Sequence, residues 1–215
     1  MTQTKTKKRT RFNLKYLPMD IARLVCAPLL LLYRMKRLTP DGKKYTAHIQ
    51  GGAVVAVNHT SFSDPFLVGV VVWYRRLYFL AAEAVMQGKL RTWLLKGVGA
   101  IRIDRNCADI EAIRNCVDVL KKGHLLSIFP QGGINHDERV TAVKSGAVLI
   151  ALQAGVPIIP MYICPKKHLL SRRVAIIGNP IDPKDYIQNK FPSTKDIEKV
   201  SQILMEEMNT CMIHQ

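Results

Sequence analysis

The sequence lacks the features that would place it among secreted or membrane-spanning proteins. Its five cysteines contain no CxxC pair and are odd in number, so we predict reduced thiols in a cytosolic environment, with no disulfide framework and no metal site. Its uninterrupted apolar run, Leu24 to Tyr33, has ten residues, whereas a membrane-spanning helix needs ~20. No secretory signal with a small-residue cleavage site is apparent. A disulfide-stabilised domain and a bilayer span are therefore not predicted.

Acidic residues are scarce, and the resulting positive charge is unevenly placed. The chain has 16 Asp and Glu against 32 Lys and Arg, a formal net charge of +16. Residues 1–44 hold 12 of the basic and two of the acidic residues, or +10, which leaves +6 for the remaining 171 residues. Such a concentration favours nucleic acid, anionic lipid or an acidic substrate as partner. Aromatic residues make up only 7% and no nucleic-acid-binding signature is present, so no nucleic acid is expected.

Residues 1–44 are predicted to form a membrane-associating helical segment. Basic residues flank an apolar body on both sides, and each of them is worth about 1 kcal/mol near anionic lipid. One helix, or two short helices broken near Pro28, would lie in the headgroup layer. This arrangement predicts a peripheral or monotopic protein at the cytoplasmic face of the cell membrane. The alternative is an amphipathic helix packed on its own domain, with a solvated basic face.

Residues 45–215 are predicted to form one α/β domain with a mostly parallel central sheet flanked by helices. A turn signal, Pro40-Asp41-Gly42, precedes this part of the chain. Short apolar runs then alternate with stretches of helical periodicity, which is typical of an α/β layer. The predicted strands are 53–57, 77–81, 100–103, 125–129, 157–163 and 173–177, and the predicted helices are 65–73, 86–97, 107–122, 143–154 and 193–212.

The polar octet from Asn58 to Pro65 lies between the first of these strands and the helix that follows it. In open α/β sheets, ligands bind at this carboxyl edge. His59 is suited to accept a proton near neutral pH, and a carboxylate five residues later, Asp64, can fold back to orient the imidazole. A second interpretation is also open: Ser61 caps the helix, Asp64 completes a capping box, and His59 is a surface loop residue.

Polar residues also follow other predicted strands. Asp104-Arg105-Asn106 follows one strand, and a glycine-rich segment from Pro130 to Gly133 follows another. Lys144 precedes a predicted helix. Together with His59 and Asp64 these segments supply a base, an orienting acid, cations and a glycine-rich loop. Such a set fits a hydroxyl activated by a base, with a nearby cation that holds an anionic acceptor.

In this order the segments resemble the glycerolipid acyltransferase family, and more narrowly the bacterial 1-acyl-glycerol-3-phosphate acyltransferases. The family pattern begins with asparagine-histidine, four residues and an aspartate. It continues with a glycine-to-arginine block, a phenylalanine-proline-glutamate-glycine block, and a valine-proline-isoleucine-isoleucine-proline block. The resemblance covers residues 50–165. The matching positions are Asn58, His59 and Asp64; Gly99, Ile103, Asp104 and Arg105; Phe129, Pro130 and Gly132; and Val156 to Pro160.

The resemblance implies transfer of a fatty acyl group from acyl-CoA or acyl carrier protein to the free hydroxyl of a lysophosphatidic-acid-like lipid, giving phosphatidic acid. His59 would be the general base and Asp64 its orienting acid, and the acyl donor would be a co-substrate in a reaction without a cofactor. Direct attack by the acceptor agrees with the absence of a GxSxG segment that would supply a serine nucleophile. Predicted substrate-binding residues are Asn58, Arg105, Gln131, Gly132, Gly133 and Lys144, with Arg105 and then Lys144 as candidates for the acceptor's phosphate.

One block departs from the family pattern. Where the family continues with glutamate, glycine, threonine or serine, and arginine, this chain reads Gln131-Gly132-Gly133-Ile134. Gln131 can form hydrogen bonds but carries no charge, and the trailing arginine is missing. The departure leaves another lyso-lipid or an amino-lipid open as the acceptor. A basic nucleic-acid-binding module and a non-catalytic membrane protein are the alternatives from other classes.

Overall fold

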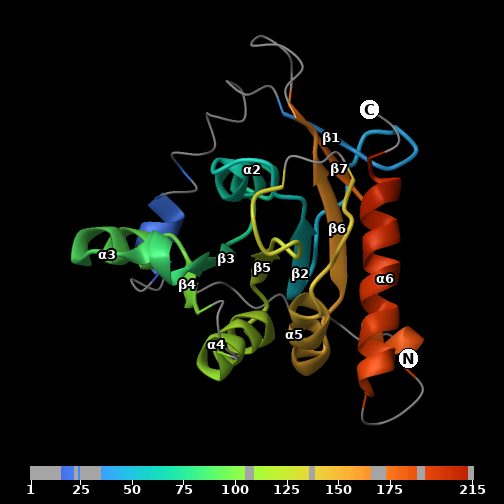
Figure 1. The fold of residues 1–215 in the computed structure, drawn as a ribbon. Helices are drawn as coiled ribbons and strands as arrows, with labels where there is room; N and C mark the ends of the chain where they lie inside the picture. Colours follow the sequence, from blue (N-terminus) through green and yellow to red (C-terminus); the bar gives the residue numbers. More distant parts are fainter. Residues whose placement is uncertain are drawn as a thin grey trace, which may run out of the picture.

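A seven-stranded sheet forms the centre of the computed structural model, which describes residues 16–21, 24, 35–104, 109–135, 139–165, 173–187 and 192–212. Within these residues the strand order is β1-β7-β6-β2-β5-β3-β4 (Figure 1). Every neighbouring pair is parallel except β6 and β7, which are antiparallel. The strands are β1 (Lys36–Leu38), β2 (Ala53–Val57), β3 (Leu77–Ala82), β4 (Ala100–Ile103), β5 (Leu125–Ile128), β6 (Ile158–Ile163) and β7 (Val174–Ile177).

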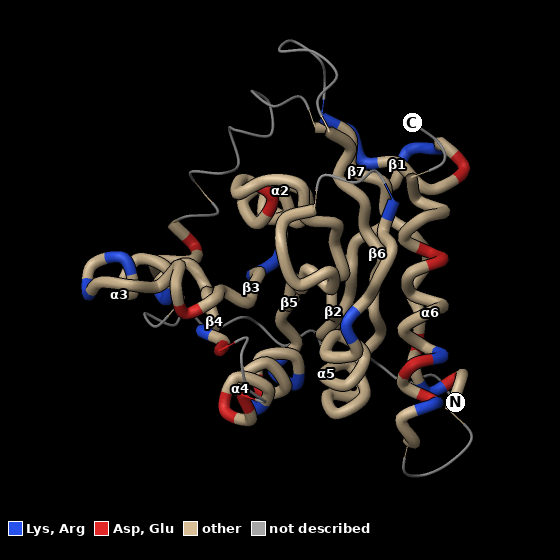
Figure 2. The backbone as a smooth tube through the Cα atoms, viewed as in Figure 1, with Lys and Arg blue, Asp and Glu red and all other residues tan. Residues whose placement is uncertain are grey.

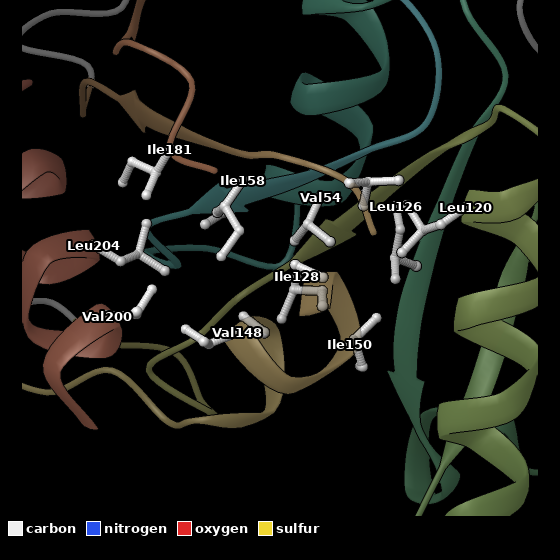
Figure 3. Close-up of a cluster of buried hydrophobic side chains, with 14 of the residues drawn as sticks. Val54, Leu120, Leu126, Ile128, Val148, Ile150, Ile158, Ile181, Val200 and Leu204 are labelled. Carbon is white, nitrogen blue, oxygen red and sulfur yellow. The ribbon is translucent and has the colours of Figure 1, made fainter. Parts of the chain in front are cut away.

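Helices cover both faces of the sheet, which explains why its central strands are apolar throughout. All five residues of β2 are fully buried. Val54 and Ala56 belong to the core under α4, α5 and α6, part of which is shown in Figure 3, while Val55 and Val57 pack on the opposite face against α2. The helical elements are α2 (Asp64–Val71), η2 (Glu83–Met86), α3 (Lys89–Gly97), α4 (Ile110–Lys121), α5 (Gly146–Ala154), η3 (Pro183–Tyr186) and α6 (Thr194–Thr210).

The predicted fold class is confirmed, and each predicted strand agrees with an observed strand to within one residue at either end. The predicted helix over 86–97 is instead two elements, η2 and α3, separated at Gly88, whose φ is +90°. Such a φ favours glycine and interrupts a helix. Strand β1 was not predicted, because three residues at a sheet edge carry too little apolar pattern. It pairs with β7, so part of the predicted 1–44 segment belongs to the sheet.

Residues 16–21 are docked on the α/β domain beside β3. Residues 17–21 are helical, and the Arg76 guanidinium donates to both carboxylate oxygens of Asp20, from Nε at 3.0 Å and from Nη2 at 2.7 Å. The same guanidinium lies 4.3 Å from the centroid of the Tyr16 ring. For these residues the alternative of packing against the domain is therefore realised.

Most of the apolar run from Leu24 to Tyr33 lies outside the described residues, so the membrane-seated segment stays a prediction, while β1 within the predicted 1–44 segment is already part of the sheet. None of the helices in the described ranges combines the length and the apolar character needed to cross a bilayer.

The backbone at Gly52 touches the C-terminal end of α4, and this contact gives a test of the packing. A Cβ added at Gly52 would lie 2.2 Å from the carbonyl oxygen of Leu120, a backbone atom. We expect Gly52→Ala to lower the free energy of unfolding by about 1–3 kcal/mol, as overpacking does. Gly69→Ala in α2 is the control, since nothing lies within 4 Å of its added Cβ, and it should raise stability by about 0.5–1 kcal/mol. Urea denaturation measures both, and equal midpoints would contradict the packing described.

Candidate active site

The loop between β2 and α2 brings His59 and Asp64 together. The imidazole Nδ1 lies 3.1 Å from Asp64 Oδ2. Asp64 is the first residue of α2, with Pro65 in the first turn, and its side chain turns back toward the loop. There it also accepts hydrogen bonds from the backbone N–H groups of Thr60 and Ser61, both at 2.7 Å, and from the Ser61 hydroxyl at 3.0 Å. The predicted contact between His59 and Asp64 is thus present, and the Asp64 carboxylate also accepts hydrogen bonds from Thr60 and Ser61.

Asp64 is ionised at neutral pH because its hydrogen bonds outweigh its burial. The residue is only 1% exposed, and burial alone would raise its pKa. The donors from His59, from the backbone of Ser61 and Thr60 and from the Ser61 hydroxyl act against it, and the pKa of Asp64 lies below its ordinary value. An ionised carboxylate only accepts hydrogen bonds. His59 Nδ1 is therefore the donor to Asp64, and in a neutral imidazole this tautomer has its lone pair on Nε2.

The alternative interpretation of the octet holds in part. Asp64 Oδ2 accepts from the Ser61 N–H and Ser61 Oγ accepts from the Ser63 N–H at 3.3 Å, so Ser61 and Asp64 do bond as in part of a capping box. The same Asp64 oxygen also bonds His59. His59 is not an exposed surface residue, since its side chain is 13% exposed, and this part of the alternative is wrong. The octet holds an imidazole in one orientation.

The end of β5 forms the other side of the site. The ring of Phe129 stacks on the His59 imidazole with centroids 4.2 Å apart and an interplanar angle of 27°. The backbone N–H of Asn135 donates to the His59 carbonyl at 2.7 Å, and the His59 N–H donates to Gln131 Oε1 at 3.5 Å. Phe129, Asn135 and Ser61 were not predicted as site residues. Phe129 and Ser61 belong to quoted motifs, but their contacts depend on the pairing of neighbouring strands.

The glycine-rich loop after β5 carries the ammonium group of Lys144. Gly132 has φ of +81°, and a Cβ there would lie 2.7 Å from Lys144 Nζ and 2.6 Å from Cε. The loop closes through a bond from Gly132 N–H to the Phe129 carbonyl, and the Lys144 N–H donates to the Pro130 carbonyl at 2.8 Å. Lys144 is exposed and directly precedes Ser145 and α5. The structure therefore joins Gln131, Gly132, Gly133 and Lys144 in one loop cluster beside His59.

Two further predicted residues have different positions. Asn58 is 3% exposed, and its amide bonds the backbone of Ile163 in β6 twice, accepting at 2.8 Å and donating at 3.1 Å. This side chain joins two strand ends, and its predicted contact with substrate stays a prediction. Arg105 lies outside the described residues, so its role as a phosphate ligand also stays a prediction.

Charged side chains on β4 and before α4 form an ion pair and hydrogen bonds to the backbone. Arg102 on β4 forms an exposed ion pair with Glu83 at 2.7 Å. The carboxylate of Asp109 accepts from the N–H of Asp104 at 3.1 Å and from that of Ala112 at 2.9 Å, which caps α4. In the part of the chain that the structure describes, no three His, Cys, Asp or Glu residues gather in a way that could hold a metal ion.

Comparison with known proteins identifies the family to which this site belongs. The family model described as Acyltransferase matches residues 37–164, which span every described site residue. The chain belongs to the acyltransferase family. The predicted family and the prediction that the protein is an acyl-transfer enzyme are thereby confirmed.

The relatives of this acyltransferase include proteins named 1-acyl-sn-glycerol-3-phosphate acyltransferase. The protein of that name from Bacillus subtilis is 26% identical over 162 residues, covering 73% of this chain and 79% of the relative. The one from Streptococcus pneumoniae is 32% identical over 160 residues, covering 72% of this chain but 58% of the relative. A lyso-ornithine lipid O-acyltransferase from Pseudomonas aeruginosa is 31% identical over 107 residues, covering 49% of this chain and 40% of the relative.

A solved structure shows the same fold. The crystal structure of the 1-acyl-sn-glycerophosphate acyltransferase PlsC from Thermotoga maritima superposes with a TM-score of 0.58 at 20% identity, covering 89% of this chain and 79% of that chain. The likeness extends beyond the residues that the family model matches.

Proposed function

We propose that this acyltransferase moves a fatty acyl group from a thioester donor to the free hydroxyl of a lysophosphatidic-acid-like acceptor, giving phosphatidic acid. The observation that carries the proposal is the orientation of the His59 imidazole by the buried, ionised Asp64. The names of the Bacillus and Streptococcus relatives support the acceptor. The acyl donor is acyl-CoA or acyl carrier protein, and no cofactor takes part.

His59 Nε2 accepts the proton of the acceptor hydroxyl as the oxygen attacks the thioester carbonyl. The C–O bond forms and the carbonyl becomes a tetrahedral oxyanion, while the imidazolium is stabilised by the Asp64 carboxylate 3.1 Å from Nδ1. Collapse of the intermediate breaks the C–S bond. The proton on Nε2 then passes to the departing thiolate, which restores neutral His59 and releases a free thiol. Phe129, stacked on the imidazole, keeps the ring from rotating.

Lys144 is our candidate for the residue that binds the anionic group of the acceptor. Its ammonium lies over the Gly132 backbone, and the loop that carries both is hydrogen-bonded to the His59 loop. A cation at this place can pair with an anionic headgroup, whereas the neutral Gln131 can only form hydrogen bonds to it. It stands in a loop whose sequence lacks the trailing arginine of the family pattern.

A second acceptor class is favoured by one block of the sequence and by one relative. The segment Gln131-Gly132-Gly133-Ile134 departs from the family pattern, and the Pseudomonas relative is named for acylation of a lyso-ornithine lipid. An acceptor with an amino-acid headgroup would still present a hydroxyl to His59. The chemistry is then unchanged, and only the group held by the loop cluster differs.

A thiol-release assay tests the proposal. Palmitoyl-CoA is supplied with lysophosphatidic acid, lyso-ornithine lipid or other lyso-lipids in detergent, and released thiol is measured. We expect release that depends on lysophosphatidic acid. Release with only the phosphate-free acceptor would retain the reaction and replace the acceptor. If no acceptor supports thiol release from palmitoyl-CoA, acyl carrier protein is the donor to supply next. Absence of acyl transfer from that donor as well would overturn the proposal.

Lys144→Ala should raise the acceptor KM about tenfold or more while kcat changes little, as expected when binding common to the ground state and the transition state is lost. Lys121→Ala is the matched control, since Lys121 is also exposed but lies at the end of α4. Steady-state kinetics with varied acceptor measures both parameters. An unchanged KM would exclude Lys144 from acceptor binding, and a fall in kcat alone would give it a role in the transition state.

The proposed site of action is the cytoplasmic face of the cell membrane, with anionic lipid as the partner of the basic N-terminal residues. The lipid acceptor itself resides in a membrane, so a peripheral or monotopic enzyme meets it there. The excess of +10 in residues 1–44 supports this location because cytoplasmic leaflets carry anionic lipid.

A further inference from the structure

Helix α3 presents most of its large apolar residues to solvent, which is the reverse of an ordinary surface helix. Leu90 is 71% exposed, Trp93 is 69% exposed and Leu94 is 53% exposed. With Gly97 they recur at spacings of three and four residues, so they share one face of the helix. No residue of α3 is buried. Burial within the domain therefore does not explain why these side chains are apolar.

The opposite side of α3 makes the contacts with the domain. Leu95 packs against the small core of Ala81, Met86 and Ala100, and the Thr92 hydroxyl donates to the Met86 carbonyl. Leu90, Trp93 and Leu94 lie on the other side of the helix from Leu95 and Thr92. They therefore face away from the sheet.

Basic side chains border the apolar face of α3. By helical geometry Lys89 and Lys96 lie along one border and Arg91 along the other, and the helix contains no acidic residue. Figure 2 shows these basic positions on α3, which projects from the sheet edge next to β4. An apolar face flanked by cations is the pattern of a helix that lies in the headgroup layer of an anionic membrane.

Helix α3 also meets the N-terminal helical residues. A Cβ at Gly97 would lie 3.4 Å from Pro18, so these two segments touch. Further along the N-terminal stretch, Ile21 is 52% exposed and Leu24 is 74% exposed. The ion pair between Asp20 and Arg76 holds residues 16–21 in place. Two segments far apart in the sequence thus meet at the C-terminal end of α3, and both carry exposed apolar side chains.

The apolar face of α3 lies on the same side of the sheet as the helix that begins at the active site. Leu77 on β3 packs with the core under α2, and Phe79 and Ala81, which alternate with it along the strand, pack near α3. Alternate strand residues share a face. Phe62, in the loop between His59 and α2, is 80% exposed, so apolar side chains also flank the site.

We propose that the outer face of α3, formed by Leu90, Trp93 and Leu94 and bordered by Lys89, Arg91 and Lys96, is an interfacial membrane anchor for anionic lipid. It acts beside the basic N-terminal segment. A second copy of the chain fits this surface poorly, because a two-fold contact would bring the cations of one helix against those of the other. The inference rests on exposed side chains of α3 and does not depend on which acceptor is acylated.

The test is binding of the full chain to vesicles of phosphatidylcholine with and without phosphatidylglycerol, measured by sedimentation. The combined variant Leu90→Ser, Trp93→Ser, Leu94→Ser should weaken binding to the anionic vesicles about tenfold or more. The control is Ile110→Ser, since Ile110 is 61% exposed on α4, which packs on the other face of the sheet. This control should bind like the parent protein.

A direct readout avoids dependence on the folding of the combined variant. The chain has two tryptophans, so Trp73→Phe leaves Trp93 as the reporter. Its emission should shift to shorter wavelength on anionic vesicles and should be quenched by brominated lipid. Unchanged emission in the bound protein would overturn the proposal. Unchanged vesicle binding by the combined variant would also overturn the proposal. If the variant kept vesicle binding but lost self-association or binding to acyl carrier protein, the surface would belong to a protein partner.

Turnover separates this proposal from the proposed reaction. With donor and acceptor dispersed in detergent, the α3 variant should retain the parent kcat, because none of its three substitutions touches the His59 site. His59→Ala should show the converse, with vesicle binding retained and turnover lost. Loss of detergent-phase turnover in the folded α3 variant would place α3 in the catalytic machinery and contradict the anchor.

Discussion

His59→Ala should lower kcat by about 10²- to 10⁴-fold, the usual contribution of a positioned general base. The variant has no group to accept the hydroxyl proton, and the proposed direct attack offers no covalent route around the loss. Thiol release from palmitoyl-CoA at saturating acceptor measures the effect.

The fold should survive the loss of His59, which makes the kinetic result interpretable. Asp64 keeps its hydrogen bonds from the backbone of Thr60 and Ser61 and from the Ser61 hydroxyl, so its buried charge is still compensated. The free energy of unfolding should therefore fall by only about 1.5–3 kcal/mol, the contribution of a hydrogen bond to a charged group. A folded variant with parental turnover would show that His59 is not the base.

Asp64→Asn should lower kcat by about 10²-fold while the loop keeps its shape. The amide oxygen can replace Oδ2 toward His59, Thr60 and Ser61, and the amide N–H can donate to the Ser61 hydroxyl. What is lost is the negative charge that stabilises the imidazolium and selects the tautomer. A charge-assisted hydrogen bond is worth about 1.5–3 kcal/mol, and each 1.36 kcal/mol corresponds to a factor of ten in rate. Single-turnover kinetics measures the effect on the chemical step.

The control for this variant is Ser61→Ala, which removes the single bond from the hydroxyl to Asp64 Oδ1. It retains the charge and the contact with His59, and we expect its kcat to fall far less than that of Asp64→Asn. If both variants lost the same activity, loop geometry would matter more than the carboxylate charge. Asp64 would then not be the group that stabilises the imidazolium.

Asp64 also makes stability depend on pH. Its pKa in the folded protein is below the ordinary value, so the stabilisation is present above the unfolded-state pKa of ~3.9. It is lost as the pH falls through the lower folded-state pKa, because folding then no longer favours the ionised form. The difference in unfolding free energy between the parent and Asp64→Asn should shrink over that acidic range. Denaturation at a series of pH values measures it, and a constant difference would contradict the lowered pKa.

Much of the fold follows from local sequence pattern. The β2 run Ala53–Val57 is apolar at every position because helices cover both faces of the sheet, and its short length, its valines and the preceding Gly51-Gly52 locate such a strand. The spacing of His59 and Asp64 likewise predicts their contact, since five residues of loop can return a carboxylate to an imidazole. Where the pattern is short, prediction fails. β1 has three residues, and its place beside β7 depends on a partner far along the chain.

The residues of the chain therefore determine the proposed catalytic pair, the helices and strands that hold it, and the family to which the chain belongs. Tertiary structure decides what surrounds that pair. Phe129 reaches the His59 ring because β5 pairs with β2, and Lys144 lies over Gly132 because the chain returns to the glycine-rich loop before α5. The exposed face of α3 is also a tertiary result. An amphipathic pattern shows that a helix has an apolar side, but only the packing of Leu95 shows that this side faces away from the core.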